Sequence, residues 1–251
     1  MAALATQLAT LENYSACDVS DALIKLQKIP AGDTARAGHL ADLVPFSPTT
    51  GRNETTPNIA APATTFQFIP KDTHPPAIAT DNPDTYGFPP GKHWVDYAGD
   101  YAAADPSKAG SIVVIEQPEA QHCAVTGGIM ATRMKVLGIK AAVVGGRVRD
   151  LRELRATRLP IWARATSTVG TNAEAKPGAR NVPINVGGVT VSPGDIVFCD
   201  PLEGVVVIPR DLLGAVLDNL PKLTGMDDKA KEAVAMGMPV MDAFKKFRSP
   251  L

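Results

Sequence analysis

The residues best suited to chemistry lie at the two ends of one short segment, residues 126–153. Gly127 and Gly128 open it, and Arg149 and Asp150 follow an apolar run that ends in two further glycines. An arginine guanidinium can hold a carboxylate through two parallel hydrogen bonds. An aspartate carboxylate is a hard oxygen ligand that suits Mg²⁺ or Mn²⁺. The pair therefore predicts a site for a divalent metal cation and a small carboxylate.

The glycine pair directly precedes a pattern that is typical of a helix. Apolar residues recur at helical spacing after Gly128, and Gly138 ends the pattern. The first amides of a helix have no intrahelical partner and carry partial positive charge, which favours a bound anion. We therefore expect the backbone at Gly127, Gly128, Ile129 and Met130 to bind a carboxylate.

The elements between these two ends form one αβ unit. After the helix, the run AAVVGG predicts a short buried strand, and residues 151–158 predict a second short helix. A purely structural alternative makes Asp150 the N-cap of that second helix and pairs Arg149 with Glu153 on its surface. The residues alone leave both interpretations open.

Histidine and cysteine are two further residue types that could take part in chemistry. His122 precedes the glycine pair by five positions and is a candidate proton donor, whereas Cys123 is more typical of packing. His74 and His93 lie in residues 70–106, which are rich in proline and aromatic residues and predict a long loop. Such a loop could cover a site or form a subunit interface. Histidines in a loop of this kind are usually solvated.

The rest of the chain predicts further helices and strands. Ser20 or Asp18 is the expected cap within the first helical region. Helices are expected over residues 5–28, 211–223 and 227–247. Strands are expected over residues 39–44, 61–69, 110–116, 159–164, 196–200 and 204–209, with a hairpin over 182–191 and a loop over 165–181.

Composition narrows the class of protein. The chain has 251 residues, 45% of them hydrophobic and 20% charged, which predicts an ordinary globular protein. Its net charge of −1 gives no reason to expect a nucleic-acid partner. No apolar run approaches the roughly 20 residues that span a bilayer, and no signal peptide is expected at the start of the sequence. Three scattered cysteines favour neither disulfides nor a zinc site. A cytoplasmic protein without a membrane partner is expected.

The succession GGIM, GGRVRDLRE, NVPINVGG and VSPGDIVFCDPLEGVVVIP resembles one known family from about Ser15 to Pro209. This is the RraA-like family, which contains the regulator of ribonuclease activity A and the metal-dependent 4-hydroxy-4-methyl-2-oxoglutarate aldolases. The resemblance implies a single α/β domain over residues 1–251, with a swivelling ββα-type core, a mixed sheet flanked by helices, and a C-terminal helical segment over 211–251. It also implies a homotrimer or hexamer with the active site near a subunit boundary.

The resemblance assigns roles to the residues already singled out. The backbone of Gly127, Gly128, Ile129 and Met130 would bind the pyruvyl carboxylate of a 2-keto acid. The catalytic residues would be Arg149, which binds substrate, and Asp150, which ligates Mg²⁺ or Mn²⁺. The implied reaction is metal-dependent cleavage of a carbon–carbon bond, by retro-aldol or by loss of CO₂ from oxaloacetate, through a pyruvate enolate.

Two features of the chain keep alternatives open. Aldolases of this family carry an acidic residue 21 positions before the arginine, and counting back from Arg149 reaches Gly128. The proton would then come from His122, from a neighbouring subunit or from water. The long stretch 70–106 also departs from compact members. The alternatives are a non-catalytic regulatory protein and a family member that acts on a secondary-metabolite substrate.

Overall fold

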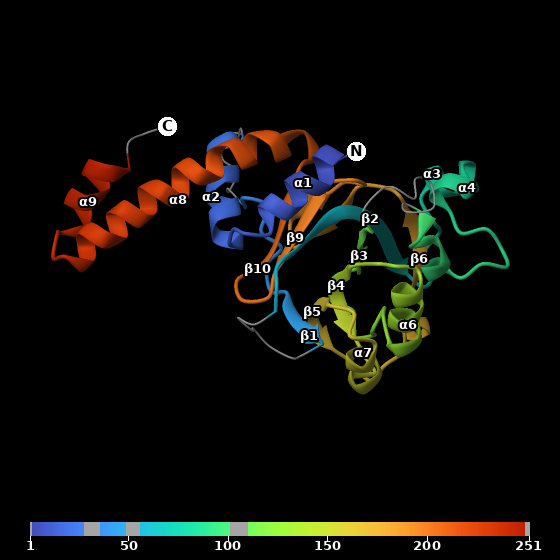
Figure 1. Ribbon diagram of the computed structural model, residues 1–251. Coiled ribbons are helices and arrows are strands. Elements are labelled where there is room, and N and C mark those ends of the chain that lie inside the picture. The colour runs from blue at the N-terminus through green and yellow to red at the C-terminus, as the bar shows by residue number, and fades with distance from the viewer. Residues whose placement is uncertain (1, 28–35, 49–55, 101–109, 249–251) are drawn as a thin grey trace.

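The computed structural model describes residues 2–27, 36–48, 56–100 and 110–248, and its centre is an eight-stranded mixed sheet (Figure 1). The strands are β1 (Val44–Ser47), β2 (Ile59–Pro70), β3 (Ile112–Glu116), β4 (Ala141–Val148), β5 (Ile161–Thr166), β6 (Ala175–Arg180), β9 (Ile196–Asp200) and β10 (Gly204–Ile208), with a separate hairpin of β7 (Ile184–Val186) and β8 (Val189–Val191). The helices are α1 (Ala2–Leu11), α2 (Ala16–Leu26), α3 (Ala77–Asp81), α4 (Pro83–Tyr86), α6 (Gly128–Val136), α7 (Leu151–Thr157), α8 (Leu213–Ala235) and α9 (Val240–Phe247), with 3₁₀ turns η1 (Trp94–Tyr97), η2 (Thr171–Ala173) and η3 (Arg210–Leu212).

Four neighbouring strands of the sheet are parallel. β3 pairs with β2 and β4, and β4 pairs with β5, all in the parallel sense. Helix α6 connects β3 to β4, and α7 connects β4 to β5. The residues of β3 and β4 are almost all buried, as expected for strands covered on both faces. Because these strands run in one direction, the residues that follow β2, β3 and β4 meet at the same edge of the sheet.

The other half of the sheet is antiparallel. β2 is long, so its first residues pair with β9 and its last residues pair with β6. Helices α1, α2 and α8 cover β9 and β10, with a core of side chains that includes Leu23 and Phe198. The cap of α2 differs from the sequence prediction. It is Ser15, whose hydroxyl accepts from the Asp18 amide while the Asp18 carboxylate accepts from the Ser15 amide.

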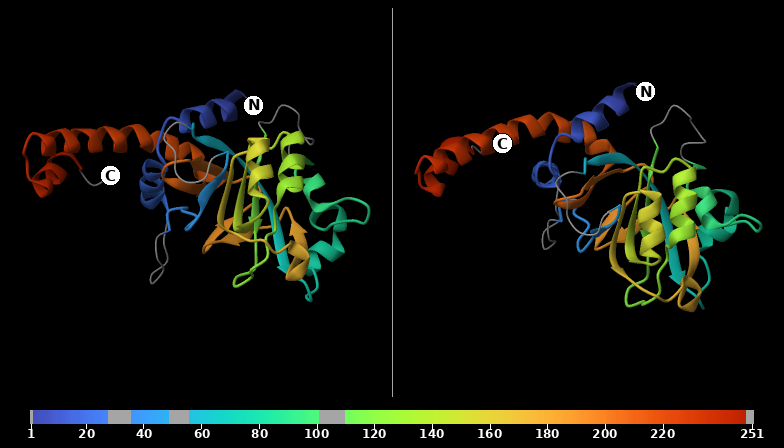
Figure 2. Two further views of the ribbon diagram at one scale, coloured as in Figure 1. Left: turned by 90° about the horizontal axis from the view of Figure 1, so that it is seen from below. Right: turned by 60° about the horizontal axis from the view of Figure 1, so that its bottom comes forward.

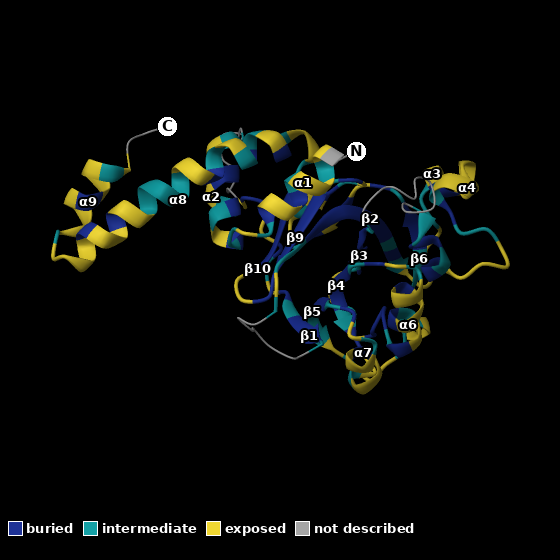
Figure 3. Ribbon diagram, in the orientation of Figure 1, coloured by how far each residue is buried: buried dark blue, intermediate teal, exposed yellow. Residues whose placement is uncertain are grey.

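The helical C-terminus also differs from the prediction. Gly225 was expected to separate two helices, but it lies inside α8, where a β-carbon would contact nothing within 4 Å. The helix instead ends before Gly237, which has a φ of +95° and so takes a conformation that favours glycine. The end of α8 and all of α9 extend away from the sheet (Figure 2). Much of the surface of this arm is exposed (Figure 3).

Residues 70–100 are more ordered than the sequence indicated. They contain α3, α4 and η1, while residues 101–106 of the predicted loop lie outside the described residues. Pro83 stands at the first position of α4, where its fixed φ suits a helix and its missing N–H is not needed. Local chemistry of this kind can start a helical turn within a proline-rich stretch.

Two predicted elements were wrong. The expected loop over residues 165–181 contains β6. The sequence AKPGAR has low strand propensity, so its own residues do not predict a strand, and it is extended because it pairs with the last residues of β2. The strand expected over residues 39–44 is only a single bridge between His39 and Val206. Asp42 has a φ of +62°, which interrupts the extended backbone before β1 begins.

The mixed α/β class with a sheet flanked by helices is confirmed. Helices α6 and α7 and the turn η1 pack on one face of the parallel strands, and the β7–β8 hairpin packs on the other. Among the helices of the described residues, none is long and apolar enough to cross a membrane. The assignment of residues 1–251 to one domain stays a prediction.

Candidate active site

A pocket of about 570 Å³ lies where β2 and β4 end. In parallel sheets, ligands commonly bind outside the carboxyl ends of the strands. The structure brings to this pocket five of the six residues that the sequence singled out: Gly127, Ile129, Met130, Arg149 and Asp150. The sixth, Gly128, is the first residue of α6 and is buried beside them.

Asp150 has an unusual backbone conformation, with φ 58° and ψ 44°. Only a few residue types besides glycine adopt this left-handed region readily, and aspartate is one of them. The residue stands at the N-cap position of α7, but its side chain caps no amide there. Its Oδ2 instead accepts from the Gly128 amide at 3.2 Å and lies 3.4 Å from Nε of Arg149. Non-glycine residues in sparsely populated conformations cluster at functional sites.

This geometry differs from the structural alternative for the pair. The carboxylate of Asp150 faces the pocket and not its own helix, and Arg149 is bonded to Asp150 rather than to Glu153. Both side chains keep part of their surface exposed, 43% for Arg149 and 36% for Asp150. Two opposite charges at the mouth of one pocket are therefore available to a ligand.

The start of α6 supplies free amides beside this pair. Gly127 is the N-cap and has no side chain to cap the helix. The Gly128 amide is taken by Asp150. Within the described parts of the chain, no acceptor faces the amides of Ile129 and Met130. These two N–H groups lie at the positive end of a helix, which favours a bound anion, and the anion site itself stays a prediction.

The donor set fits a hard cation such as Mg²⁺ or Mn²⁺. In the described residues, no group of three or more His, Cys, Asp or Glu side chains is placed to hold a metal ion. Among the described lining residues, Asp150 is the one with an acidic side chain, and its Oδ2 contacts the Gly128 amide and Arg149. Mg²⁺ usually keeps several waters and takes one or two carboxylates together with substrate oxygens. One carboxylate beside an open pocket meets that requirement.

Glu153 is a neighbour of this site that the sequence did not reveal. A β-carbon added to Gly128 would lie 1.9 Å from Oε2 of Glu153 and 2.5 Å from its Cβ. The glycine therefore leaves room for a carboxylate that arrives from α7. Gly128 stands at the position where the sequence comparison expected an acidic side chain, and the carboxylate of Glu153 lies beside it. The spacing of Gly128 and Glu153 along the chain carries no signal of this contact.

We expect Gly128→Ala to lower the free energy of unfolding by about 1–3 kcal/mol, because the new methyl group overlaps Glu153. Urea denaturation would measure this. Gly214→Ala is a matched control in α8, where a β-carbon meets nothing within 4 Å, and we expect it to be neutral or stabilising by up to about 1 kcal/mol. The double variant with Glu153→Ala should recover only part of the loss, because it removes Oε2 but keeps Cβ of residue 153. Equal effects of the two alanines would contradict the contact.

The remaining candidates lie in different places. His122 does not line the pocket: it borders a second, smaller cavity of about 160 Å³, so its predicted role as proton donor finds no support in the geometry. His93 does line the main pocket, whereas His74 does not. Cys123 is buried in the core, and burial raises the pKa of its thiol, which agrees with the packing role expected for it.

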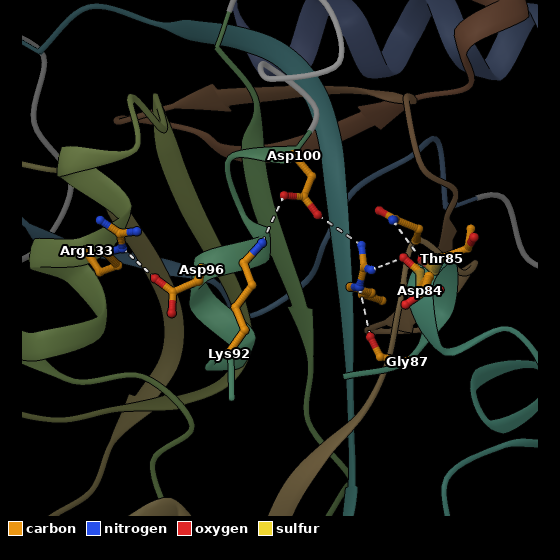
Figure 4. Close-up of polar contacts among 9 residues, drawn as sticks. Asp84, Thr85, Gly87, Lys92, Asp96, Asp100 and Arg133 are labelled. Carbon is orange, nitrogen blue, oxygen red and sulfur yellow. Dashed lines mark hydrogen bonds and ion pairs between the residues drawn. The ribbon is translucent and has the colours of Figure 1, made fainter. Parts of the chain in front are cut away.

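Two aromatic side chains form one wall of the pocket, which we call the aromatic wall. One of them lies in η1, within the stretch 70–106 that the sequence predicted as a loop. Phe68 at the end of β2 and Trp94 of η1 both line the pocket. Nε of Arg133 in α6 donates to Oδ1 of Asp96 in η1 at 2.6 Å (Figure 4). The same helix that offers its free amides to an anion therefore also holds the wall.

The contact between Asp96 and Arg133 predicts an acid-sensitive wall. The hydrogen bond from Arg133 lowers the pKa of Asp96 below its usual 3.8. The ionised Asp96 carboxylate therefore contributes fully to stability above about pH 3.8. This contribution is lost as the pH falls through the lower pKa that Asp96 has in the folded state. Fluorescence of Trp94, followed in a Trp162→Phe background, should change only below that pH. In Asp96→Asn this acid transition should be absent.

Comparison with known proteins shows the family of the chain. The sequence pattern of the family described as RraA-like, Aldolase/RraA, matches residues 16–207. The chain belongs to the RraA-like family. A protein of Halalkalibacterium halodurans that carries the provisional name 4-hydroxy-4-methyl-2-oxoglutarate aldolase is 33% identical over 135 residues, 54% of this chain and 63% of that protein. Protein DlpA of Legionella pneumophila is 27% identical over 74% of this chain and 27% of its own length. The chain thus spans less than two thirds of the length of these relatives.

Two solved structures share the fold. An uncharacterised protein from Pseudomonas syringae superposes with a TM-score of 0.68 at 22% identity, over 96% of this chain and 94% of that chain. RraAS2 of Streptomyces coelicolor, described as an unusual member of the RNase ES inhibitor RraA protein family, has a TM-score of 0.62 at 22% identity, over 93% and 96%. At this level of identity the likeness shows the RraA fold and not the activity.

Proposed function

We propose that this RraA-like protein is a metal-dependent lyase that cleaves a carbon–carbon bond of a 2-keto acid and releases pyruvate. The observation that carries the proposal is the convergence of Arg149, Asp150 and the free amides of Ile129 and Met130 in one pocket. The provisional aldolase name of a relative at 33% identity supports the same class of reaction. The substrates to test first are 4-hydroxy-4-methyl-2-oxoglutarate and oxaloacetate.

Each residue has a role that follows from its chemistry. The two amides and the Arg149 guanidinium bind and orient the pyruvyl carboxylate. As the C3–C4 bond breaks, negative charge develops on the keto oxygen, and the fixed positive charge of Arg149 stabilises it. A divalent cation bound through Asp150 would supply Lewis-acid polarisation of that oxygen. No lysine is among the pocket-lining residues of the described chain, so a Schiff base is not part of the proposal.

The final step requires a proton at C3. Glu153 places a carboxyl group against Gly128 but is not among the residues that line the pocket. His93 and solvent have direct access to the pocket. Loss of CO₂ from oxaloacetate needs no base to start it, whereas retro-aldol cleavage needs the C4 hydroxyl to lose its proton. The two substrates therefore place different demands on these groups.

Pyruvate release from both substrates, with Mg²⁺, with Mn²⁺ and with EDTA, tests the proposal. A coupled lactate dehydrogenase assay would follow it. Turnover that requires the metal would support the lyase, and turnover of oxaloacetate alone would limit it to decarboxylation. No release from either substrate, in a folded protein that binds the metal, would overturn these activities and favour a regulatory protein without catalysis.

We also propose assembly as a homotrimer or hexamer. The arm formed by α8 and α9 extends from the sheet and exposes large apolar side chains, among them Met236, Val240 and Met241. Contacts between copies would remove this surface from water. Light scattering coupled to size-exclusion chromatography tests this, and a monomer at micromolar concentration would contradict it. The cytoplasmic location and the absence of nucleic-acid and membrane partners stay predictions.

A further inference from the structure

The pocket has a polar side beyond the anion site. His93, Thr171 and Asn172 line this side, and each of them keeps part of its surface exposed. The Thr171 hydroxyl donates to the Ala124 carbonyl at 2.7 Å, so this donor holds the backbone and is not available to a ligand. His93 and Asn172 are therefore the two side chains on this side that can donate to a bound molecule.

Asn172 lies close to the Arg149 guanidinium. Gly170 packs against that guanidinium, since a β-carbon on Gly170 would lie 3.1 Å from Nη1 of Arg149. Asn172 follows two residues later in η2, so its Cα lies within about 7 Å of the Cα of Gly170. Within the described residues, the side-chain amide of Asn172 has no hydrogen-bond partner. Its two N–H donors are therefore available to a ligand that is bound at Arg149.

His93 borders the same pocket from the end of β2. The turn η2 leads into β6, whose first residues pair with the last residues of β2. Trp94 packs on Phe68 near that end, and His93 is the residue before Trp94. Nδ1 of His93 accepts from the Val95 amide at 3.4 Å, so the neutral ring carries its proton on Nε2. This Nε2–H is the second donor on the polar side.

Hydrogen bonds fix the segment that carries His93. Asp96, three residues later, accepts from Arg133 of α6 at 2.6 Å. On the other side of His93, the carbonyl of Gly87 accepts from the buried guanidinium of Arg180 in β6 (Figure 4). The segment is thus attached to α6 and to β6, and its position exists before a ligand binds.

The charges around these two donors do not repel a carboxylate. Among the described lining residues only Asp150 is acidic, and it lies beside Arg149. Asp96 is paired as described above, and the Glu174 carboxylate accepts from two backbone amides after β3, at 2.6 Å each. Because both donors are exposed to water, a carboxylate bound to them keeps part of its hydration and loses little by desolvation.

We propose that His93 and Asn172 are specificity-determining residues that bind the second carboxylate of a 2-keto dicarboxylate. This assignment rests on the proposed function for the pyruvyl end. Three C–C bonds link the two carboxyl carbons of oxaloacetate and four link those of 4-hydroxy-4-methyl-2-oxoglutarate, so these carbons lie roughly 4–5 Å apart. A substrate held at Arg149 therefore places its second carboxylate near η2, where donors without a protein acceptor meet a group that only accepts.

Two unreactive 2-keto acids test this assignment without turnover. 2-Oxoglutarate has the main carbon chain of the aldol substrate but lacks its 4-hydroxyl, so it cannot undergo the retro-aldol step. 5-Methyl-2-oxohexanoate has the same head and a similar shape, with an isopropyl group in place of the second carboxylate. Isothermal titration of the full chain with Mg²⁺ would give both dissociation constants. We expect 2-oxoglutarate to bind at least about tenfold more tightly, a difference of ~1.4 kcal/mol.

Substitutions at the two positions should lower this preference. His93→Asn keeps an oxygen that can accept from the Val95 amide but is too short to replace Nε2, and should lower the preference about threefold. Asn172→Asp keeps the shape but replaces the donors with a negative charge, and should remove the preference. His74→Asn, in the same proline-rich stretch but outside the pocket, is the matched control and should leave both constants unchanged.

The outcomes separate this assignment from the proposed function. Equal or tighter binding of 5-methyl-2-oxohexanoate by the wild type would overturn the assignment, as would binding of neither compound. An unchanged preference in folded His93→Asn or Asn172→Asp would overturn the role of the residue that was replaced. Selective binding of 2-oxoglutarate without pyruvate release from any substrate would support the assignment and overturn the lyase. Pyruvate release without this selectivity would support the lyase and overturn the assignment.

Discussion

Asp150→Asn is expected to lower metal-dependent pyruvate release by a factor of about 10³ or more. The substitution removes the anionic oxygen that would ligate the cation, and a bound cation contributes several kcal/mol to stabilising the charge that develops on the keto oxygen. Arg149 and the free amides of α6 remain, so the carboxylate of the substrate still has its partners. Steady-state rates with and without Mg²⁺, and metal affinity by titration, would measure the loss.

The asparagine is chosen so that the fold is retained. Asparagine also tolerates the left-handed backbone of residue 150, and its amide oxygen can still accept from the Gly128 N–H. Asp218→Asn, an exposed position on α8, is the control for the loss of one negative charge and should have wild-type rates. Metal-stimulated turnover that survives in Asp150→Asn would contradict the assignment of this residue as the metal ligand.

Arg149→Ala should behave differently from Asp150→Asn. Metal affinity should be retained, while KM for the 2-keto acid should rise and kcat should fall, because the guanidinium is proposed to contact both the bound carboxylate and the developing charge. Arg149→Lys should recover little, since an ammonium cannot form the two parallel hydrogen bonds of the fork. Loss of metal binding in Arg149→Ala would contradict the assignment of metal binding to Asp150 alone and of substrate binding to Arg149.

The part of the site that the sequence predicted is local. Gly127 to Met130 form the start of one helix, and Arg149 and Asp150 follow the next strand, so the β3–α6–β4 order alone brings them to one edge of the sheet. The apolar runs of β3, β4, β9 and β10 were likewise predicted, because buried strands have a signature in their own residues.

The part that the sequence did not predict depends on contacts between distant segments. Strand β6 is extended because it pairs with β2, and its own residues favour a loop. The turn η1 is contacted by Arg133 and Arg180, which lie far along the chain from it. The contact between Glu153 and Gly128 arises from the packing of α7 on α6. Periodicity and local propensity carry no information about such pairings.

Arg180→Ala is expected to have the largest effect on stability, a loss of about 2–4 kcal/mol in the free energy of unfolding. The buried guanidinium donates to two backbone carbonyls and to Asp100, and it lies over the ring of Tyr97. Hydrogen bonds from a charged donor contribute about 1.5–3 kcal/mol, and a desolvated cation–π contact contributes up to about 2 kcal/mol. The carbonyls left without a donor add to the cost.

Urea denaturation and the fluorescence of Trp94 distinguish two ways in which Arg180 could act. Arg152→Ala, an exposed arginine on α7, is the matched control and should change stability by less than about 0.5 kcal/mol. If Arg180 holds the aromatic wall, Arg180→Ala should also loosen Trp94 below the urea concentration at which the sheet unfolds. A stability equal to that of Arg152→Ala would show instead that aromatic packing of Trp94 on Phe66 and Phe68 is sufficient to hold the wall.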